Sequence, residues 1–227
     1  MSVHFQSDLS ALHKDLLSMS ASVEEMIHRA VAQLSKPSIE DARSLMEQDT
    51  EIDRWDVVIE ENCLKMLALH QPVAIDLRRI TTMLKLVAEL ERVADLAVNI
   101  AERACGLLDA PEVAVPDELK EMAQRAVNML HRAIDAYVAL DSQMARDVCR
   151  EDDDIDDANE LLINRLIEQM HSQPDRVDAL LHLFSAVRQV ERVADHATNI
   201  AEDVVYLVEG RIIRHARKLE RYTLQER

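Results

Sequence analysis

The sequence is poor in the residues that sheets and turns require. Only two glycines and five prolines interrupt its 227 residues, and aromatic residues make up 3% of them. Sheets depend on aromatic and β-branched side chains and on turn residues, so this composition disfavours a β-fold. A mixture rich in Ala, Leu, Val, Met, Glu and Arg favours helices. The composition therefore predicts an all-α fold, in one large domain or two small ones.

Cysteine pairs and long apolar runs are also missing. The three cysteines, Cys63, Cys105 and Cys149, are far apart and form no CxxC pair, which is typical of reduced thiols in a cytoplasmic protein. The N-terminus has no apolar signal core, and the longest uncharged run has ten residues, Met66–Ile75, and includes a proline. A membrane-spanning helix needs about 20 apolar residues. We therefore expect a cytoplasmic protein that reaches a membrane only through its partners.

Positive charge is scarce as well. The chain has 26 Lys and Arg residues against 43 Asp and Glu residues, a formal net charge of −17. Nucleic-acid partners are therefore not expected, because a phosphate backbone requires a basic surface. The excess of negative charge suits metal cations, basic protein surfaces or solubility alone. The balance reverses only in a basic C-terminal tail, residues 211–227, which we expect to continue the last helix.

Prolines and glycines divide the chain into six helical segments that form two similar halves. Apolar residues recur at helical spacing between these breaks, and short loops favour antiparallel packing. The predicted helices are residues 9–34, 37–69, 75–105, 118–140, 142–170 and 177–209. The predicted architecture is two tandem pseudo-symmetric three-helix bundles, residues 1–108 and 118–210, joined by a linker at residues 109–117.

Three residues carry smaller expectations about helix ends and packing. Gly106 and Gly210 each follow a predicted helix, where glycine commonly adopts the left-handed conformation. Trp55 is expected to pack on the apolar face of its helix with Ile52 and Ile59.

A twelve-residue stretch occurs twice, one hundred residues apart. The sequence ERVADLAVNIAE starts at Glu91 and ERVADHATNIAE at Glu191, with ten of twelve positions identical. Four polar residues of the first copy fall within about 80° of a helix surface, beside its apolar face: Glu91, Asp95, Asn99 and Glu102. The second copy repeats this arrangement with Glu191, Asp195, Asn199 and Glu202.

Each copy is preceded, one helix earlier, by a pair of acids one helical turn apart. The pairs are Asp49 with Asp53 and Asp152 with Asp156. If the two helices of each half pack antiparallel, four carboxylates converge there. Like charges at this spacing repel by a few tenths of a kcal/mol, and all-oxygen sites suit hard cations such as Mg²⁺, Mn²⁺, Ca²⁺ or iron. The alternative is an ordinary solvated surface, balanced by Arg92 and Arg192.

Together these residues resemble the PhoU family of phosphate-signalling regulators. The resemblance covers about residues 9–210 and rests on the repeated stretch, the earlier acidic pairs and the segment Asp76-Leu-Arg78. Two departures stand out. The Ile-Gly usual inside the motif is Val-Ala in both copies, and the histidine after the aspartate is present as His196 but replaced by Leu96 in the first copy.

The resemblance implies a regulator rather than an enzyme. It implies a negative regulator of the phosphate-starvation response, which couples the phosphate ABC transporter ATPase to its membrane sensor histidine kinase. We also expect a homo-oligomer, a dimer. Phosphate itself is expected to be sensed through these partners, because the chain is acidic and has no glycine-rich phosphate-binding loop.

The resemblance also implies metal clusters on the carboxylates, with iron as the expected metal and zinc, manganese or magnesium as alternatives. The ligands that it implies are Asp49, Asp53, Glu91 and Asp95 in the first half and Asp152, Asp156, Glu191 and Asp195 in the second. Further ligands, or residues that support the ligands, are Asn99, Glu102, Asn199 and Glu202.

Two other functions remain open from the sequence. A di-iron oxidase of the helical-bundle type needs two E-x-x-H pairs, and the chain offers Glu25 with His28 and Glu168 with His171. These pairs do not occupy equivalent positions in the two halves. The other alternative is a metal-free adaptor whose acidic faces serve as a docking surface.

Overall fold

The computed structural model describes residues 3–110 and 113–213, which contain six long helices, one short 3-10 helix and no strand. The first half consists of α1 (Val3–Gln33), α2 (Ile39–His70) and α3 (Ala74–Cys105). The second consists of α4 (Asp117–Ala139), α5 (Ser142–Ser172) and α6 (Val177–Glu209), with η1 (Pro174–Arg176) before α6. The predicted all-α fold of two tandem three-helix units is confirmed. In these described ranges, no helix has the length and apolar character needed to span a bilayer.

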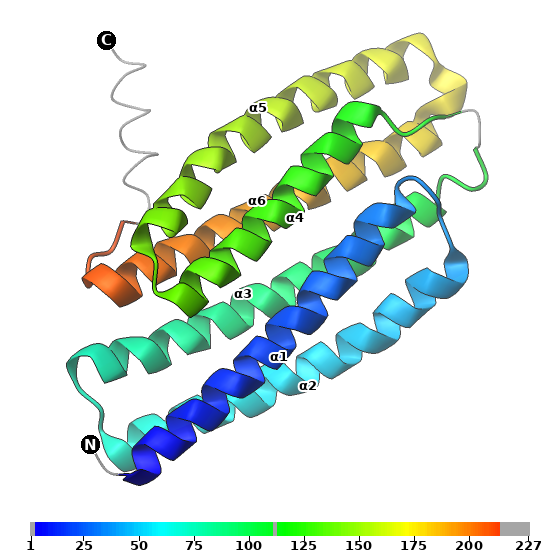
Figure 1. The fold of residues 1–227 in the computed structure, drawn as a ribbon. Coiled ribbons are helices and arrows are strands. Elements are labelled where there is room, and N and C mark those ends of the chain that lie inside the picture. Colours follow the sequence, from blue (N-terminus) through cyan, green and yellow to red (C-terminus); the bar gives the residue numbers. More distant parts are fainter. Residues whose placement is uncertain (1–2, 111–112, 214–227) are drawn as a thin grey trace, which may run out of the picture.

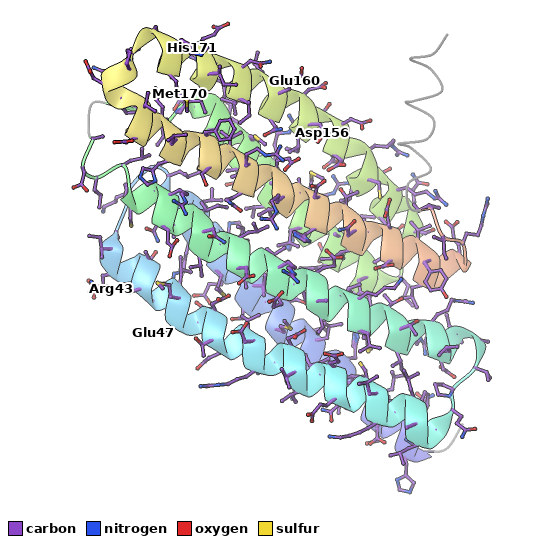
Figure 2. All side chains as sticks on the ribbon, turned by 180° about the vertical axis from the view of Figure 1, so that it is seen from behind. Arg43, Glu47, Asp156, Glu160, Met170 and His171 are labelled. Atoms are coloured by element: carbon purple, nitrogen blue, oxygen red, sulfur yellow. The ribbon has the colours of Figure 1, made fainter. Side chains whose placement is uncertain are left out.

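The helices are arranged around a central pair, α3 and α6, which lie side by side (Figure 1). Each of these two helices packs against both other helices of its own half. α1 and α4 cover one side of the pair, as seen from the front in Figure 1. On the opposite side, α2, α3, α6 and α5 lie next to one another in that order and form a broad face (Figure 2).

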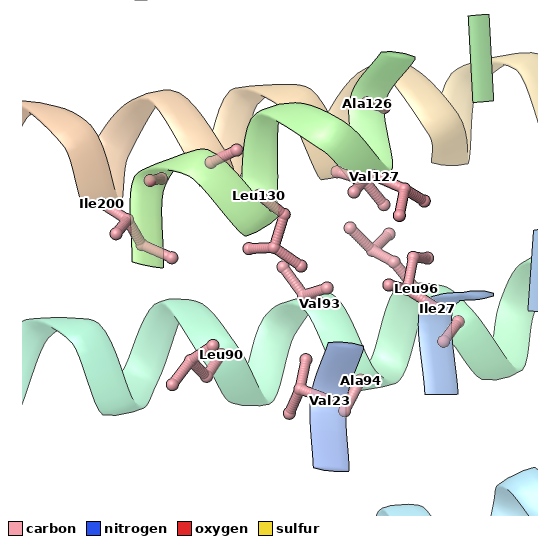
Figure 3. Close-up of a cluster of buried hydrophobic side chains, with 14 of the residues drawn as sticks. Val23, Ile27, Leu90, Val93, Ala94, Leu96, Ala126, Val127, Leu130 and Ile200 are labelled. Carbon is pink, nitrogen blue, oxygen red and sulfur yellow. The ribbon is translucent and has the colours of Figure 1, made fainter. Parts of the chain in front are cut away.

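The apolar core is continuous between the two halves. Side chains from α1 and α3 meet side chains from α4 and α6, as Figure 3 shows for Ile27, Leu96, Val127 and Leu130. Each of these four is at most 2% exposed. Burying one such side chain contributes roughly 1.5–3 kcal/mol to folding. The two three-helix units therefore share one core and are not merely tethered by their linker.

Side-chain caps fix the starts of the helices that carry the first acidic pair of each half. At α2, Ser38 Oγ accepts a hydrogen bond from the backbone N–H of Asp41 at 3.3 Å. At α5, Asp141 Oδ1 accepts one from the backbone N–H of Gln143 at 2.9 Å. A cap of this kind typically contributes about 1 kcal/mol.

The two glycines that follow α3 and α6 have different conformations. The predicted left-handed conformation is confirmed for Gly210 and wrong for Gly106. Gly210 has a φ of +71° and ends α6 in the left-handed conformation, as expected. Gly106 has a helical φ of −61°, but a Cβ atom there would lie 2.4 Å from the ring of His182. Close packing against His182, and not backbone conformation, favours glycine at this position.

Two further expectations do not hold. Residues 211–213 are not helical, so the basic tail does not continue α6, and residues 214–227 lie outside the described chain. Trp55 is 38% exposed, whereas Ile52 and Ile59 are each 1% exposed. Trp55 lies at the edge of the apolar stripe of α2, where a large indole ring is only partly covered.

Candidate metal centre

The acidic pairs of each half face one another across two neighbouring helices. In the first half, the pair on α2 lies opposite the repeated stretch on α3, and in the second half α5 and α6 repeat this pairing. All four helices belong to the broad face, on which Asp156 is labelled in Figure 2. Most of the predicted ligands are half-buried, and only Asp53 and Asp195 are exposed.

The carboxylates of the first half lie close enough to raise one another's pKa values. Burial, together with the charges of Asp95, Asp53 and Glu91, raises the pKa of Asp49 from 3.8 to about 6. Burial and Asp95 also raise the pKa of Glu91, while Arg92, whose Nε lies 3.4 Å from Glu91 Oε2, acts in the opposite direction. Carboxylates from α2 and α3 therefore share one electrostatic environment.

The second half repeats this arrangement. Burial, together with the charges of Asp156 and Asp195, raises the pKa of Asp152 from 3.8 to about 6. Burial and Asp195 also raise the pKa of Glu191, and the nearby Arg188 partly offsets this. The Oε2 atom of Glu191 is buried and has no hydrogen-bond partner in the described part of the chain. Such an unpaired acceptor is costly, and a bound cation would satisfy it.

Asp56 belongs to the first acidic cluster, although it is not among the predicted ligands. Burial raises its pKa, with Glu60 and Asp53 adding to the effect, and Asp56 in turn raises the pKa of Glu91. The sequence contained the signal, because Asp56 follows Asp49 by seven residues, two helical turns along the same face.

The second half has an amide at the position that corresponds to Asp56. This residue is Asn159, which follows Asp152 by the same seven residues. Its Oδ1 atom is buried and, like Oε2 of Glu191, has no hydrogen-bond partner among the described residues. Two of the unpaired buried oxygen acceptors of the second half thus belong to its acidic cluster, Asn159 Oδ1 on α5 and Glu191 Oε2 on α6.

The donor set fits a hard cation in chemical type. All of the clustered donors are oxygen atoms, which Mg²⁺, Mn²⁺ and iron accept readily. However, no three carboxylate, imidazole or thiol groups of residues 3–110 and 113–213 lie close enough together to hold a metal ion. Mutual repulsion opposes a closer approach of the charged groups. Metal binding would therefore require rotation of these side chains towards one another.

The amides and outer glutamates of the repeated stretch occupy different surroundings. Asn199 Nδ2 donates to Glu89 Oε2 at 3.2 Å across the α3–α6 interface, and Glu202 lines a small cavity with Lys85 of α3. Asn99 Nδ2 donates to the backbone oxygen of Asp95 at 2.8 Å, and Glu102 is exposed. Asn199 thus joins the two halves, whereas Asn99 bonds within its own helix.

The difference between Leu96 and His196 follows from the surroundings of the two positions. His196 Nδ1 lies 2.6 Å from Glu89 Oε2, so the imidazole pairs with the carboxylate of the other half. Leu96 is 1% exposed and packs in the shared core (Figure 3). The residue that corresponds to Glu89 in the second half is the uncharged Gln189. At the equivalent place on the other side of the interface, the Glu89–His196 pair is therefore replaced by Gln189 and Leu96, neither of which carries a charge.

The two E-x-x-H pairs do not form a common site. All four residues are exposed: Glu25, His28, Glu168 and His171. The first pair lies on α1 and the second on α5, two helices that make no contact within the described chain. His171 stands at the far end of α5 in Figure 2. This geometry does not support a di-iron oxidase.

Comparison with known families gives one result for both halves of the chain. The family model described as the PhoU domain matches residues 16–104 and again residues 119–204. The first matched segment contains the acidic cluster of α2 and α3, and the second contains that of α5 and α6.

Individual relatives match the chain over nearly its whole length. A protein of Clostridium acetobutylicum named phosphate-specific transport system accessory protein PhoU homolog is 33% identical, with 91% of this chain and 95% of the relative covered. A Synechocystis protein of the same name is 35% identical, with 92% of each chain covered.

Solved structures show the same fold. The crystal structure of PhoU from Pseudomonas aeruginosa superposes with a TM-score of 0.87 at 33% identity, over 91% of this chain and 100% of that one. The crystal structure of the phosphate transport system regulatory protein PhoU from Streptococcus pneumoniae gives a TM-score of 0.85 at 25% identity, with 92% and 99% covered.

Proposed function

The chain belongs to the PhoU family, and we propose that it regulates phosphate homeostasis as an accessory protein of a phosphate ABC transporter. The observation that supports this most directly is the double match of the family model, in which each matched segment contains one complete acidic cluster. The relatives named as accessory proteins of phosphate-specific transport are covered almost end to end. A role that depends on both halves is therefore available to this chain.

In this proposal the protein is a negative regulator of the phosphate-starvation response. It couples the transporter ATPase to a membrane sensor histidine kinase and damps signalling when phosphate is plentiful. We place it in the cytoplasm as a homodimer, and we assign it no catalytic activity. The net charge of −17 suits docking on basic surfaces of such partners, because complementary charge speeds association and suppresses wrong partners.

Deletion of the gene tests the regulatory role. Alkaline phosphatase activity would be measured in phosphate-rich and phosphate-poor medium, in the deletion strain and in the strain complemented with the intact chain. We expect high activity in rich medium after deletion and restored repression after complementation. If phosphatase stays repressed in the deletion strain, the regulatory assignment fails.

We further propose that both acidic clusters bind metal ions, iron first, with zinc, manganese or magnesium as alternatives. The residues that would hold them are the eight predicted carboxylates, joined by Asp56 in the first half and Asn159 in the second. Bound cations would neutralise the clustered charge and tie α2 to α3 and α5 to α6. The raised pKa values of Asp49 and Asp152 support this proposal, because they show how strongly burial and mutual repulsion oppose the charged state.

Elemental analysis tests the metal proposal. Metal content would be measured in protein purified without added metal, and in the variants Asp95→Asn and Asp195→Asn. Matched controls are Glu47→Gln and Glu160→Gln, which alter exposed acids on α2 and α5 (Figure 2). We expect lower metal content in the first two variants and unchanged content in the controls. Equal and negligible metal in all five proteins would instead favour the metal-free adaptor.

A further inference from the structure

A cavity of about 260 Å³ lies where the two halves meet, and its lining includes residues of α1 and α4. Both acidic clusters lie elsewhere, on α2 with α3 and on α5 with α6. The cavity wall includes Leu9 and His13 of α1, Arg79 and Met83 of α3, Tyr137 of α4 and Leu207 of α6. A ligand bound here would contact both three-helix units at once.

Besides Gln6 and Ser10, three polar side chains line this cavity: His13, Arg79 and Tyr137. His13 Nδ1 lies 3.1 Å from Tyr137 Oη, a hydrogen bond between α1 and α4, and Tyr137 is only 4% exposed. Burial lowers the pKa of His13, and the positive charge of Arg79 lowers it further. His13 is therefore neutral at pH 7, and the guanidinium of Arg79 supplies the positive charge.

The guanidinium group of Arg79 has N–H donors available for a ligand. Within the described chain its one ionic contact is with Asp76 Oδ1 at 3.7 Å, which is too long for a hydrogen bond. The Arg79 side chain is 37% exposed, so its N–H groups are free to meet a ligand that enters from solvent. A guanidinium presents parallel N–H donors that match the two oxygens of a carboxylate.

Apart from Gln6 and Ser10 of α1, the remaining residues of the cavity wall are apolar. Leu9, Met83 and Leu207 are 7%, 3% and 1% exposed and offer no hydrogen-bonding side chain. Inorganic phosphate is polar on all sides and would leave oxygens unsatisfied against these residues. A ligand with one anionic end and one apolar end satisfies both parts of the wall.

We propose that this cavity binds a small organic carboxylate, which no part of the proposed regulatory function requires. The carboxylate meets Arg79 beside the Tyr137–His13 pair, and the apolar part packs against Leu9, Met83 and Leu207. The size is bounded by the cavity, which has the volume of roughly nine water molecules at about 30 Å³ each. Because the walls come from both halves, the ligand binds the folded state and not the unfolded chain. Binding therefore stabilises the contact of α1 and α3 with α4 and α6.

Benzoate and benzamide form a matched pair of probes, since they share shape and size but only benzoate is charged at pH 7. Isothermal titration calorimetry on the full chain is expected to show one benzoate site and weaker binding of benzamide. Arg79→Gln should weaken benzoate binding at least tenfold and leave benzamide binding nearly unchanged. Arg125→Gln, which removes an arginine outside the cavity wall, should change neither.

The unfolding temperature of each variant, measured in parallel, shows whether it folds. Three results would overturn the proposal: no benzoate binding at millimolar concentration, equal affinity for benzoate and benzamide, or unchanged benzoate affinity in a folded Arg79→Gln protein. Inorganic phosphate serves as a competitor. If it displaces benzoate at similar concentration, the requirement for an apolar ligand body is wrong.

Discussion

Replacing Asp49 by asparagine should stabilise the protein when no metal is present. Asp49 is half-buried, and burial together with Asp95, Asp53 and Glu91 raises its pKa from 3.8 to about 6. The folded protein therefore holds a proton on Asp49 more tightly than the unfolded chain does. Between pH 4 and pH 6 the folded state binds more protons, so its stability falls as the pH rises through this window and stays lowered above it. Asparagine carries no charge and removes this penalty.

The size of the effect follows from the same pKa. A rise from 3.8 to about 6 would correspond to about 3 kcal/mol at about 1.4 kcal/mol per pKa unit. Asp49 is partly exposed, and solvent and salt screen its neighbours, so we expect about 1 kcal/mol. For a chain of this length, that is a rise of about 2–4 °C in the midpoint of thermal unfolding.

Urea unfolding of chelator-treated protein at pH 4 and pH 8 provides the assay. Asp49→Asn should raise the free energy of unfolding at pH 8 and leave it nearly unchanged at pH 4, where Asp49 is protonated in the folded state. Glu47→Gln, an exposed acid on the same helix, should have little effect at either pH. The reasoning is refuted if Asp49→Asn is equally stable or less stable than the parent at pH 8, or if its gain is the same at both pH values.

Other substitutions test contacts outside the acidic clusters. Leu96→His should destabilise the protein by about 2–4 kcal/mol in urea unfolding, because Leu96 is 1% exposed in an apolar core and burying a polar imidazole there carries a desolvation cost; an effect below 0.5 kcal/mol would contradict this. Lys85→Met should cost about 2 kcal/mol, because Asp203, 1% exposed, loses the ammonium that lies 3.0 Å away, and adding Asp203→Asn should recover most of the loss. Gly106→Ala should be destabilising alone but neutral or stabilising in a His182→Ala background, since the Cβ clashes with that ring while alanine favours the helix; equal effects in both backgrounds would rule out the clash.

Helix positions were predictable from the sequence because they depend on local signals. Apolar spacing and the proline and glycine breaks placed α3 to α6 within two residues of their observed ends. The largest error was at α1, which begins at Val3 and not near residue 9. Its first turns include Phe5, which is 4% exposed and meets the ring of His70 edge-on with a centroid distance of 5.3 Å. That contact comes from α2 and is invisible in the local sequence.

The convergence of carboxylates was also predictable, because it needs only the phase of each helix and the antiparallel packing of neighbours. The membership of Asp56 was missed, although its phase was known, because phase does not say how far a side chain is buried. Burial is the largest cause of its raised pKa. It depends on how closely the two helices approach, and a sequence pattern gives no such distance.

The contacts between the two halves could not be predicted from the sequence pattern of single helices. α3 and α6 each pack against three other α-helices. The sequence of either helix therefore does not say which neighbour a polar side chain contacts. The repeat suggests equal roles for Asn99 and Asn199, yet Asn199 bonds to Glu89 of α3 and Asn99 bonds to its own helix. The corresponding positions differ in charge: where the first half has Glu89, the second has Gln189, and Oε1 of Gln189 is buried without a hydrogen-bond partner in the described part of the chain. The two copies of the repeated stretch therefore make different contacts at the α3–α6 interface, where only Asn199 meets a charged acceptor from the other half.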